Sequence, residues 1–96
     1  MPPLPHSDIP QIFSSFWLAG FESGSQINRA GVRLDMLAST QHDQQAEADY
    51  ARLRSVRITT ARDAVRWRLI DRGGRYDFAS FAPMLAAAQR QRIQVI

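Results

Sequence analysis

The sequence contains no cysteine and no lysine, and it has only two histidines. Without cysteine, disulfides, thiol catalysis and thiolate metal sites are excluded. The histidines, His6 and His42, lack the spacing of a metal site. No apolar run approaches the ~20 residues of a membrane span, and the first residues resemble no secretory signal. We therefore expect no metal, no membrane partner and a cytoplasmic location.

The basic residues are 12 arginines, which give a formal net charge of +3. A basic chain first suggests nucleic acid as a partner. Here the arginines are interleaved with nine acids instead of forming a cluster, which argues against that partner. The 96 residues, 45% of them hydrophobic, suffice for one small domain with a modest core.

The chain divides into a short arm and a region of alternating patterns. Four of the five prolines fall in residues 1–11, which predicts an irregular arm. Apolar and β-branched runs predict strands at residues 12–21, 58–61 and 93–96. Between them we expect a helix that begins at Thr40 with a capping box, and a second one that begins at Asp77 or Ser80 and runs to about Gln91. Residues 23–39 and 64–76 read as long loops.

The spacing of apolar residues indicates which face of each helix is buried. Repeats at helical spacing predict the two inner faces, formed by Ala46, Tyr50 and Leu53 in the first helix and by Phe81, Leu85 and Ala88 in the second.

The order strand, helix, strand, helix, strand predicts an α/β fold with a parallel sheet. Ile58 and Ile93 mark successive units of about 35 residues, close to the ~31 of a (β/α)8 TIM barrel. A Rossmann fold fits less well, because neither its glycine fingerprint nor a phosphate-binding loop is present, and we expect no cofactor. Residues 12–96 are therefore expected to form about three of eight barrel strands. The last expected strand reaches Ile96 without a cap, which favours an incomplete barrel.

Functional residues of parallel α/β folds gather where strands end. Arg62 and Asp63 follow the second expected strand, and Trp67 comes shortly after. A guanidinium there can hold a carboxylate in a bidentate fork; a structural ion pair with Asp63 or another acid at the rim is the alternative. Trp67 offers a face on which a sugar can stack, or it belongs to the core. Glu22 and Gln26, after the first strand, are candidates for hydrogen bonds to ligand hydroxyls.

Catalysis by this chain alone is not expected. A glycosidase needs two carboxylates ~5–10 Å apart, and only Glu22 and Asp63 are placed to serve. Neither has the sequence setting of an acid or base. His42 falls in the first turn of a predicted helix, where we assign it no chemical role.

Several stretches resemble family 1-like glycoside hydrolases of clan A, the β-glucosidase and β-galactosidase relatives. The similarity covers most of the chain from Phe16 onward. It is carried by Phe-Trp-Leu-Ala-Gly-Phe-Glu at 16–22, Asp-Tyr at 49–50, Ile-Thr-Thr-Ala-Arg-Asp at 58–63, Arg-Trp at 66–67, Tyr-Asp-Phe at 76–78, Pro-Met-Leu at 83–85 and Ile-Gln-Val-Ile at 93–96.

The resemblance implies a TIM barrel that hydrolyses O-glycosidic bonds with retention, and a carbohydrate substrate for the complete protein. It implies that Arg62 contacts the catalytic nucleophile. Both catalytic glutamates would follow later strands, beyond Ile96, so none lies in this chain. Two features depart from the family. The sugar-binding pattern around Gln26 is partial, and Arg57 and Arg92 stand where glycine usually ends the helices, at a cost of roughly 1–2 kcal/mol in a left-handed conformation.

A different class of function stays open beside this one. The chain also fits a small stand-alone α/β module that binds anionic partners through its arginines. A piece with open sheet edges also fits a self-associating protein.

Overall fold

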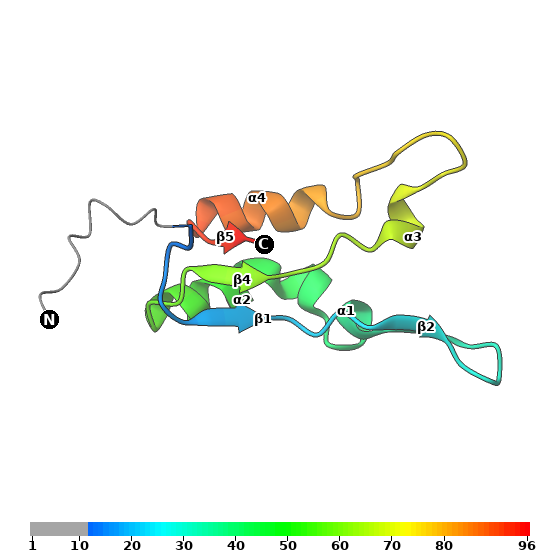
Figure 1. The fold of residues 1–96 in the computed structure, drawn as a ribbon, viewed down its shortest axis with the longest axis horizontal. Coiled ribbons are helices and arrows are strands. Elements are labelled where there is room, and N and C mark those ends of the chain that lie inside the picture. The colour runs from blue at the N-terminus through cyan, green and yellow to red at the C-terminus, as the bar shows by residue number, and fades with distance from the viewer. Residues whose placement is uncertain (1–11) are drawn as a thin grey trace, which may run out of the picture.

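The structure is a computed structural model that describes residues 12–96, so the arm predicted for residues 1–11 lies outside the described residues. The fold is mixed α/β, as the sequence predicted (Figure 1). Its elements are β1 (Leu18–Gly20), β2 (Ser25–Ile27), β3 (Arg33–Asp35), α1 (Met36–Ser39), α2 (His42–Ser55), β4 (Thr60–Arg62), α3 (Trp67–Ile70), α4 (Ala82–Arg90) and β5 (Gln94–Val95).

Three of the strands form a small parallel sheet. Its order is β1, β4, β5, with β4 in the centre, and Ala61 lies beside Ala19 on one side and Val95 on the other. Each parallel pair is joined by a connection that contains a helix, as parallel pairing requires. The predicted alternation of strands and helices is confirmed for this sheet, with β2, β3, α1 and α3 added in the connections.

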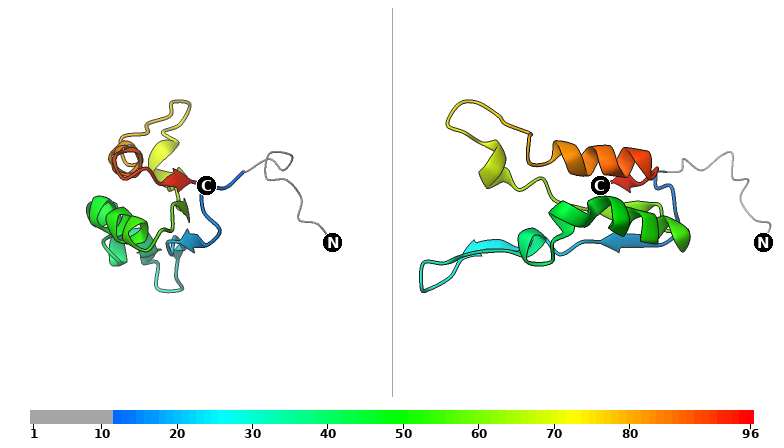
Figure 2. Two further views of the ribbon diagram at one scale, coloured as in Figure 1. Left: turned by 90° about the vertical axis from the view of Figure 1, so that its left-hand side faces the viewer. Right: turned by 180° about the vertical axis from the view of Figure 1, so that it is seen from behind.

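Helices α2 and α4 lie side by side and cover one face of the sheet (Figure 2). Strand residues alternate between two faces, and Ala61 of β4 faces these helices in the core. The buried core cluster consists of Leu37, Ala46, Tyr50, Ala61, Met84, Ala87, Ala88 and Ile93.

The predicted helix faces are borne out in α2 and partly wrong in α4. In α2, Ala46 and Tyr50 are buried and Leu53 packs against the core. In α4, Phe81 packs against the core and Ala88 is buried, as predicted, whereas Leu85 is 41% exposed. Met84 and Ala87 are buried in its place.

The first strand is shorter than predicted, because residues 12–17 do not pair in the sheet. Ser14 instead crosses to the amino ends of β4 and β5, where its backbone N–H donates to Thr60 Oγ1 at 3.1 Å and to Gln94 Oε1 at 2.9 Å. Ser15 Oγ accepts hydrogen bonds from the N–H groups of Thr59 and Thr60. These two serines therefore form hydrogen bonds with the start of β4. Such side-chain bonds compete with strand pairing, which explains why the apolar run at residues 12–17 is not part of the sheet.

Both major helices end in the same backbone turn. Arg57 and Arg92 have φ of 63° and 55°. The N–H of the next residue reaches back to the carbonyl five positions earlier, from Ile58 to Leu53 and from Ile93 to Ala88. This is the Schellman pattern. The sequence left open whether these turns are strained or differently shaped, and the structure has the strained, left-handed form at both arginines.

The two stretches expected as long loops contain regular structure. Residues 23–39 include the antiparallel hairpin β2–β3 and the short helix α1. At the hairpin turn, Asn28 Oδ1 accepts from the N–H groups of Ala30 and Val32, and Gly31 has φ of 77°. Residues 64–76 include α3, followed by a turn in which Asp71 pairs with Tyr76.

The capping box predicted at Thr40 is wrong. The Thr40 hydroxyl donates back to the carbonyl of Met36, because Thr40 ends α1. α2 begins two residues later, after Gln41 in a left-handed conformation with φ of 60° and no side-chain cap. Asp35 is the residue that caps a helix here, since its Oδ1 accepts from Ala38 N at the start of α1.

No helix within residues 12–96 combines the length and the apolar character needed to cross a membrane.

Candidate functional site

Arg62 ends β4, as predicted, and its side chain lies on the face of the sheet away from α2 and α4. Ala61 faces the helices, so the alternation of the strand places Arg62 on the other side. Its guanidinium extends over Gly20, which is its partner in register on β1. A Cβ added to Gly20 would stand 3.1 Å from Arg62 Nη2. Because Gly20 has no side chain, the guanidinium of Arg62 has room to lie over it.

Arg62 is exposed, and within residues 12–96 its side chain makes no hydrogen bond or ion pair. The alternative of an ion pair with Asp63 is not what the structure contains. A guanidinium keeps its charge at all ordinary pH values. Arg62 thus presents a free cationic fork at the carboxyl end of the central strand.

Asp63, the next residue, points the opposite way, into the helical layer. Its side chain is fully buried. Oδ2 accepts from Tyr50 Oη at 2.5 Å and pairs with His42 Nε2 at 2.6 Å, while Oδ1 accepts from Ala64 N. The carboxylate is therefore saturated by partners from α2 and its own backbone. It ties α2 to the end of β4, which differs from the free rim acid that the sequence suggested.

His42 bridges two carboxylates and is 2% exposed. Its Nδ1 lies 2.8 Å from Asp49 Oδ2, and its ring stacks on Phe21 with centroids 3.7 Å apart. Ionised carboxylates only accept hydrogen bonds, so two such partners require both ring nitrogens to donate. The geometry therefore favours the imidazolium form of His42.

The titration of this network follows from its geometry. Burial works to lower the pKa of His42, but the hydrogen bonds to Asp63 and Asp49 outweigh it and raise that pKa above 6.5. Burial works to raise the pKa of Asp63, yet the bonds from His42, Tyr50 and Ala64 outweigh it and lower that pKa below 3.8. Burial, with the bond to Asp63, raises the pKa of Tyr50. Both shifts favour the pair in which His42 is protonated and Asp63 is ionised.

A cavity of about 710 Å³ opens at the carboxyl ends of the three parallel strands. Residues that follow β1, β4 and β5 line it, together with the first turns of α4. Its walls are mainly apolar, from Val65, Trp67, Phe81, Leu85 and Ile96, and its polar groups include Ser25 and Arg66. Arg62 does not line it, so the free guanidinium and the cavity are separate features of the same end of the sheet.

Trp67, the first residue of α3, borders this cavity and is 57% exposed. The sequence left open whether it belongs to the core; the structure places it on the surface. Its ring lies 5.5 Å from that of Tyr76, itself 62% exposed. An exposed aromatic pair beside a cavity suits stacking against a planar or ring-shaped ligand.

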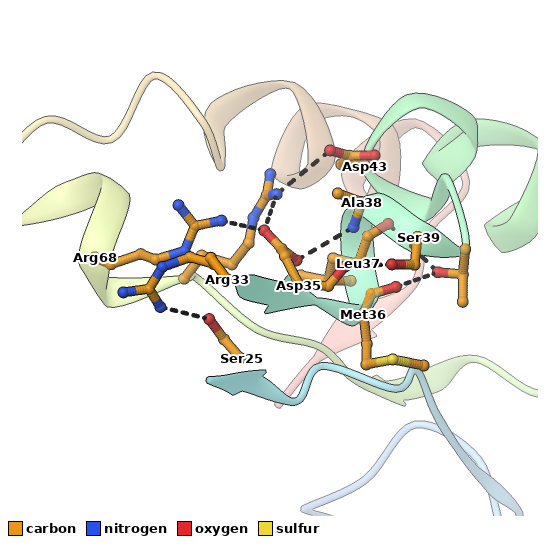
Figure 3. A network of polar contacts seen from close by, with 11 residues as sticks. Ser25, Arg33, Asp35, Met36, Leu37, Ala38, Ser39, Asp43 and Arg68 are labelled. Carbon is orange, nitrogen blue, oxygen red and sulfur yellow. Dashed lines mark hydrogen bonds and ion pairs between the residues drawn. The ribbon is translucent and has the colours of Figure 1, made fainter. Parts of the chain in front are cut away.

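A cluster of charges fixes the loop that presents Trp67 (Figure 3). Arg66 Nη1 donates to Asp35 Oδ2 at 3.1 Å and to Asp43 Oδ2 at 3.4 Å, and Arg68 pairs with the same oxygen of Asp35. Arg66 adopts a left-handed φ of 47° to do so. Burial works to raise the pKa of Asp35, but bonds from Ala38 N, Arg66 and Arg68 outweigh it and lower it. The cluster joins α3 to the base of the hairpin and the start of α2.

Glu22 and Gln26 are not brought together with the other candidates. Glu22 is exposed just after β1, and its Oε1 would lie 3.8 Å from a Cβ added at Gly24. Gln26 is exposed in β2, opposite Leu34. Neither lines the cavity, and within the described part of the chain neither side chain makes a hydrogen bond or an ion pair with Arg62.

Sequence reasoning missed the buried network of His42, Tyr50, Asp49 and Asp63. One signal for it was available, since His42 and Asp49 are seven residues apart and share a face of α2. The approach of Asp63 depends on the packing of α2 against β4, which the spacing does not reveal. Among residues 12–96, no group of three potential ligand side chains is arranged to hold a metal ion.

Comparison with known proteins gives no relative: no family model, no curated protein and no solved structure matches the chain.

Proposed function

We propose that this chain supplies the opening βα units of a glycoside hydrolase-like (β/α)8 barrel that acts on O-glycosidic bonds with retention. Arg62 is the residue that supports this most. It ends the central strand on the helix-free face, which in a closed barrel is the interior, and its guanidinium has no partner in residues 12–96. That is the setting from which an arginine can orient and ionise a carboxylate nucleophile.

The arrangement of the sheet agrees with this proposal. The parallel strands follow one another in chain order, and both α2 and α4 lie on one face (Figure 2). A doubly wound fold covers both faces of its sheet instead. The amino ends of β4 and β5 are closed by Ser14, so the carboxyl end is the open end. The catalytic glutamates that the resemblance implies are not assigned to any residue of this chain.

Reading the coding sequence in frame after the Ile96 codon tests the proposal. We expect further βα units, with a glutamate after the fourth and the seventh strand. The encoded protein should hydrolyse an aryl β-glucoside with retention, and Arg62→Gln should lower kcat by about 10²-fold or more, as expected for loss of electrostatic support. An unrelated continuation, or none, would contradict the proposal.

A second candidate, a self-associating module, is favoured by one observation. In the described region, β1 and β5 each pair on one side only. Phe16 and Trp17, just before β1, are 90% and 70% exposed. Unpaired edges flanked by exposed aromatics promote association. Light scattering that finds an oligomer at micromolar concentration would support this candidate, and a monomer would remove it.

A further inference from the structure

The base of the hairpin carries more positive than negative charge. Asp35 Oδ2 is shared by Arg66 and Arg68, and its Oδ1 accepts from Ala38 N. Asp35 therefore already accepts three hydrogen bonds. Arg33 has a neutral partner instead, because its Nη1 donates to Ser25 Oγ at 3.3 Å.

The guanidiniums of Arg33 and Arg68 are anchored at neighbouring points. Arg33 and Asp35 are two residues apart on β3 and share a face of the hairpin. Ser25, the partner of Arg33, lies directly across from Asp35, the partner of Arg68. Figure 3 shows both arginine heads on this side of the hairpin. Three arginines with two aspartates, Asp35 and Asp43, leave one positive charge uncompensated.

We propose that Arg33, Arg68 and Ser25 form a binding site for an anionic oxygen group, and that the attached part of the ligand enters the neighbouring cavity. Ser25 itself lines that cavity, beside the exposed ring of Trp67. Arginine forks match phosphate and carboxylate oxygens, and the serine hydroxyl adds a donor. The cavity offers apolar and aromatic walls to a ring. The ligand class is therefore a ring compound that bears a phosphate or carboxylate, such as a sugar phosphate or a uronic acid.

This site does not depend on Arg62 or on a barrel. It uses the hairpin and α3, which belong to connections after β1 and β4, whereas Arg62 ends β4 and does not line the cavity.

NMR titration of the full chain tests the site, with the Nε–Hε signals of Arg33 and Arg68 and the indole N–H of Trp67 as probes. Inorganic phosphate should shift both arginine signals, and the shifts should weaken as sodium chloride increases. Arg33→Gln should weaken phosphate binding about fivefold or more, because one charge-assisted contact is lost. Arg90→Gln is the matched control. It removes an equal charge on α4, where Arg90 pairs with Glu47 of α2, and it should leave binding nearly unchanged.

Three further ligands distinguish a phosphate-bearing ring from a carboxylate-bearing ring and from an uncharged one. Glucose 6-phosphate and glucuronate should move the Trp67 signal as well as the arginine signals, and whichever binds more tightly identifies the preferred group. Glucose should bind more weakly than either. Equal phosphate binding by Arg33→Gln and the unaltered chain, or no shift of the arginine signals, would overturn the site. A Trp67 response to glucose without any effect of the charged ligands would overturn it too, while leaving the glycosidase proposal standing.

Discussion

Arg62 is the last residue of β4 and Asp63 follows it directly, yet their surroundings differ in almost every respect. Asp63 turns into the helical layer, where it is fully buried and held by His42 and Tyr50. Arg62 turns to the face away from α2 and α4, where its guanidinium lies over the backbone of Gly20. Because successive residues point to opposite faces, Asp63 stabilises the fold and Arg62 stays available to a partner.

Replacing Asp63 should have the largest effect. Asp63→Ala removes the partner of a buried charged His42, so we expect a loss of about 3–5 kcal/mol in the free energy of unfolding. Urea unfolding followed by circular dichroism measures it. Glu22→Ala, an exposed acid near the end of β1, is the control and should stay within about 0.5 kcal/mol. Equal effects of the two substitutions would mean that Asp63 is not structural.

Tyr50→Phe tests the same network with a smaller change. It keeps the ring in the core and removes only the hydroxyl that donates to Asp63. Hydrogen bonds to charged groups contribute about 1.5–3 kcal/mol, and we expect a loss in that range by urea unfolding. A loss confined to a few tenths of a kcal/mol would show that His42 and Ala64 suffice to hold the carboxylate.

The free energy of unfolding should fall at both low and high pH and be highest in between. The raised pKa of His42 contributes stability that is complete below 6.5 and disappears as the pH rises through the folded-state value. The lowered pKa of Asp63 contributes stability that is present above 3.8 and disappears as the pH falls through its folded-state value. The midpoint of urea unfolding should therefore be highest between these limits.

His42→Gln identifies the alkaline limb, because a glutamine does not titrate. The variant should be less stable, and its urea midpoint should no longer fall on the alkaline side. If the fall persists in His42→Gln, another group is responsible for it.

The turn between α2 and β4 allows the losses above to be compared with the free energy of a strained backbone. Arg57 has φ of 63°, where glycine is not strained. Arg57→Gly should therefore stabilise the chain by about 1 kcal/mol, as a gain in the urea midpoint. Arg54→Gly, inside α2, is the control and should lose at least about 1 kcal/mol, because it also removes the hydrogen bonds from Arg54 to the carbonyls of Gln91 and Arg92. A destabilised Arg57→Gly variant would indicate that the arginine side chain contributes contacts worth more than the backbone strain.

The sequence predicted the parts of the fold that depend on local patterns. The β-branched run at 58–61 and the apolar run at 93–96 locate two of the three parallel strands to within two residues, and Arg62 ends β4 as expected. The sequence also located the helix-ending turns at Arg57 and Arg92, although it left open whether they are left-handed. In each case the spacing of apolar residues or the end of a helix carries the signal within a few residues.

The elements that were missed lack such a signal. Strands β2 and β3 are almost entirely exposed, so no buried face marks them in the sequence. α3 has four residues, too few for a repeat. Its position depends on the contacts of Arg66 with Asp35 and Asp43, which are distant in the chain. His42 was given no role because its partner Asp63 reaches it only through packing.

Arg62→Gln tests the contrast between the two neighbours most directly, by urea unfolding in parallel with Asp63→Ala. A guanidinium without a partner contributes little to the fold, so Arg62→Gln should change the free energy of unfolding by less than about 0.5 kcal/mol. A loss comparable to that of Asp63→Ala would contradict the account, because it would show that Arg62 holds the fold together instead of being available to a ligand or a catalytic carboxylate.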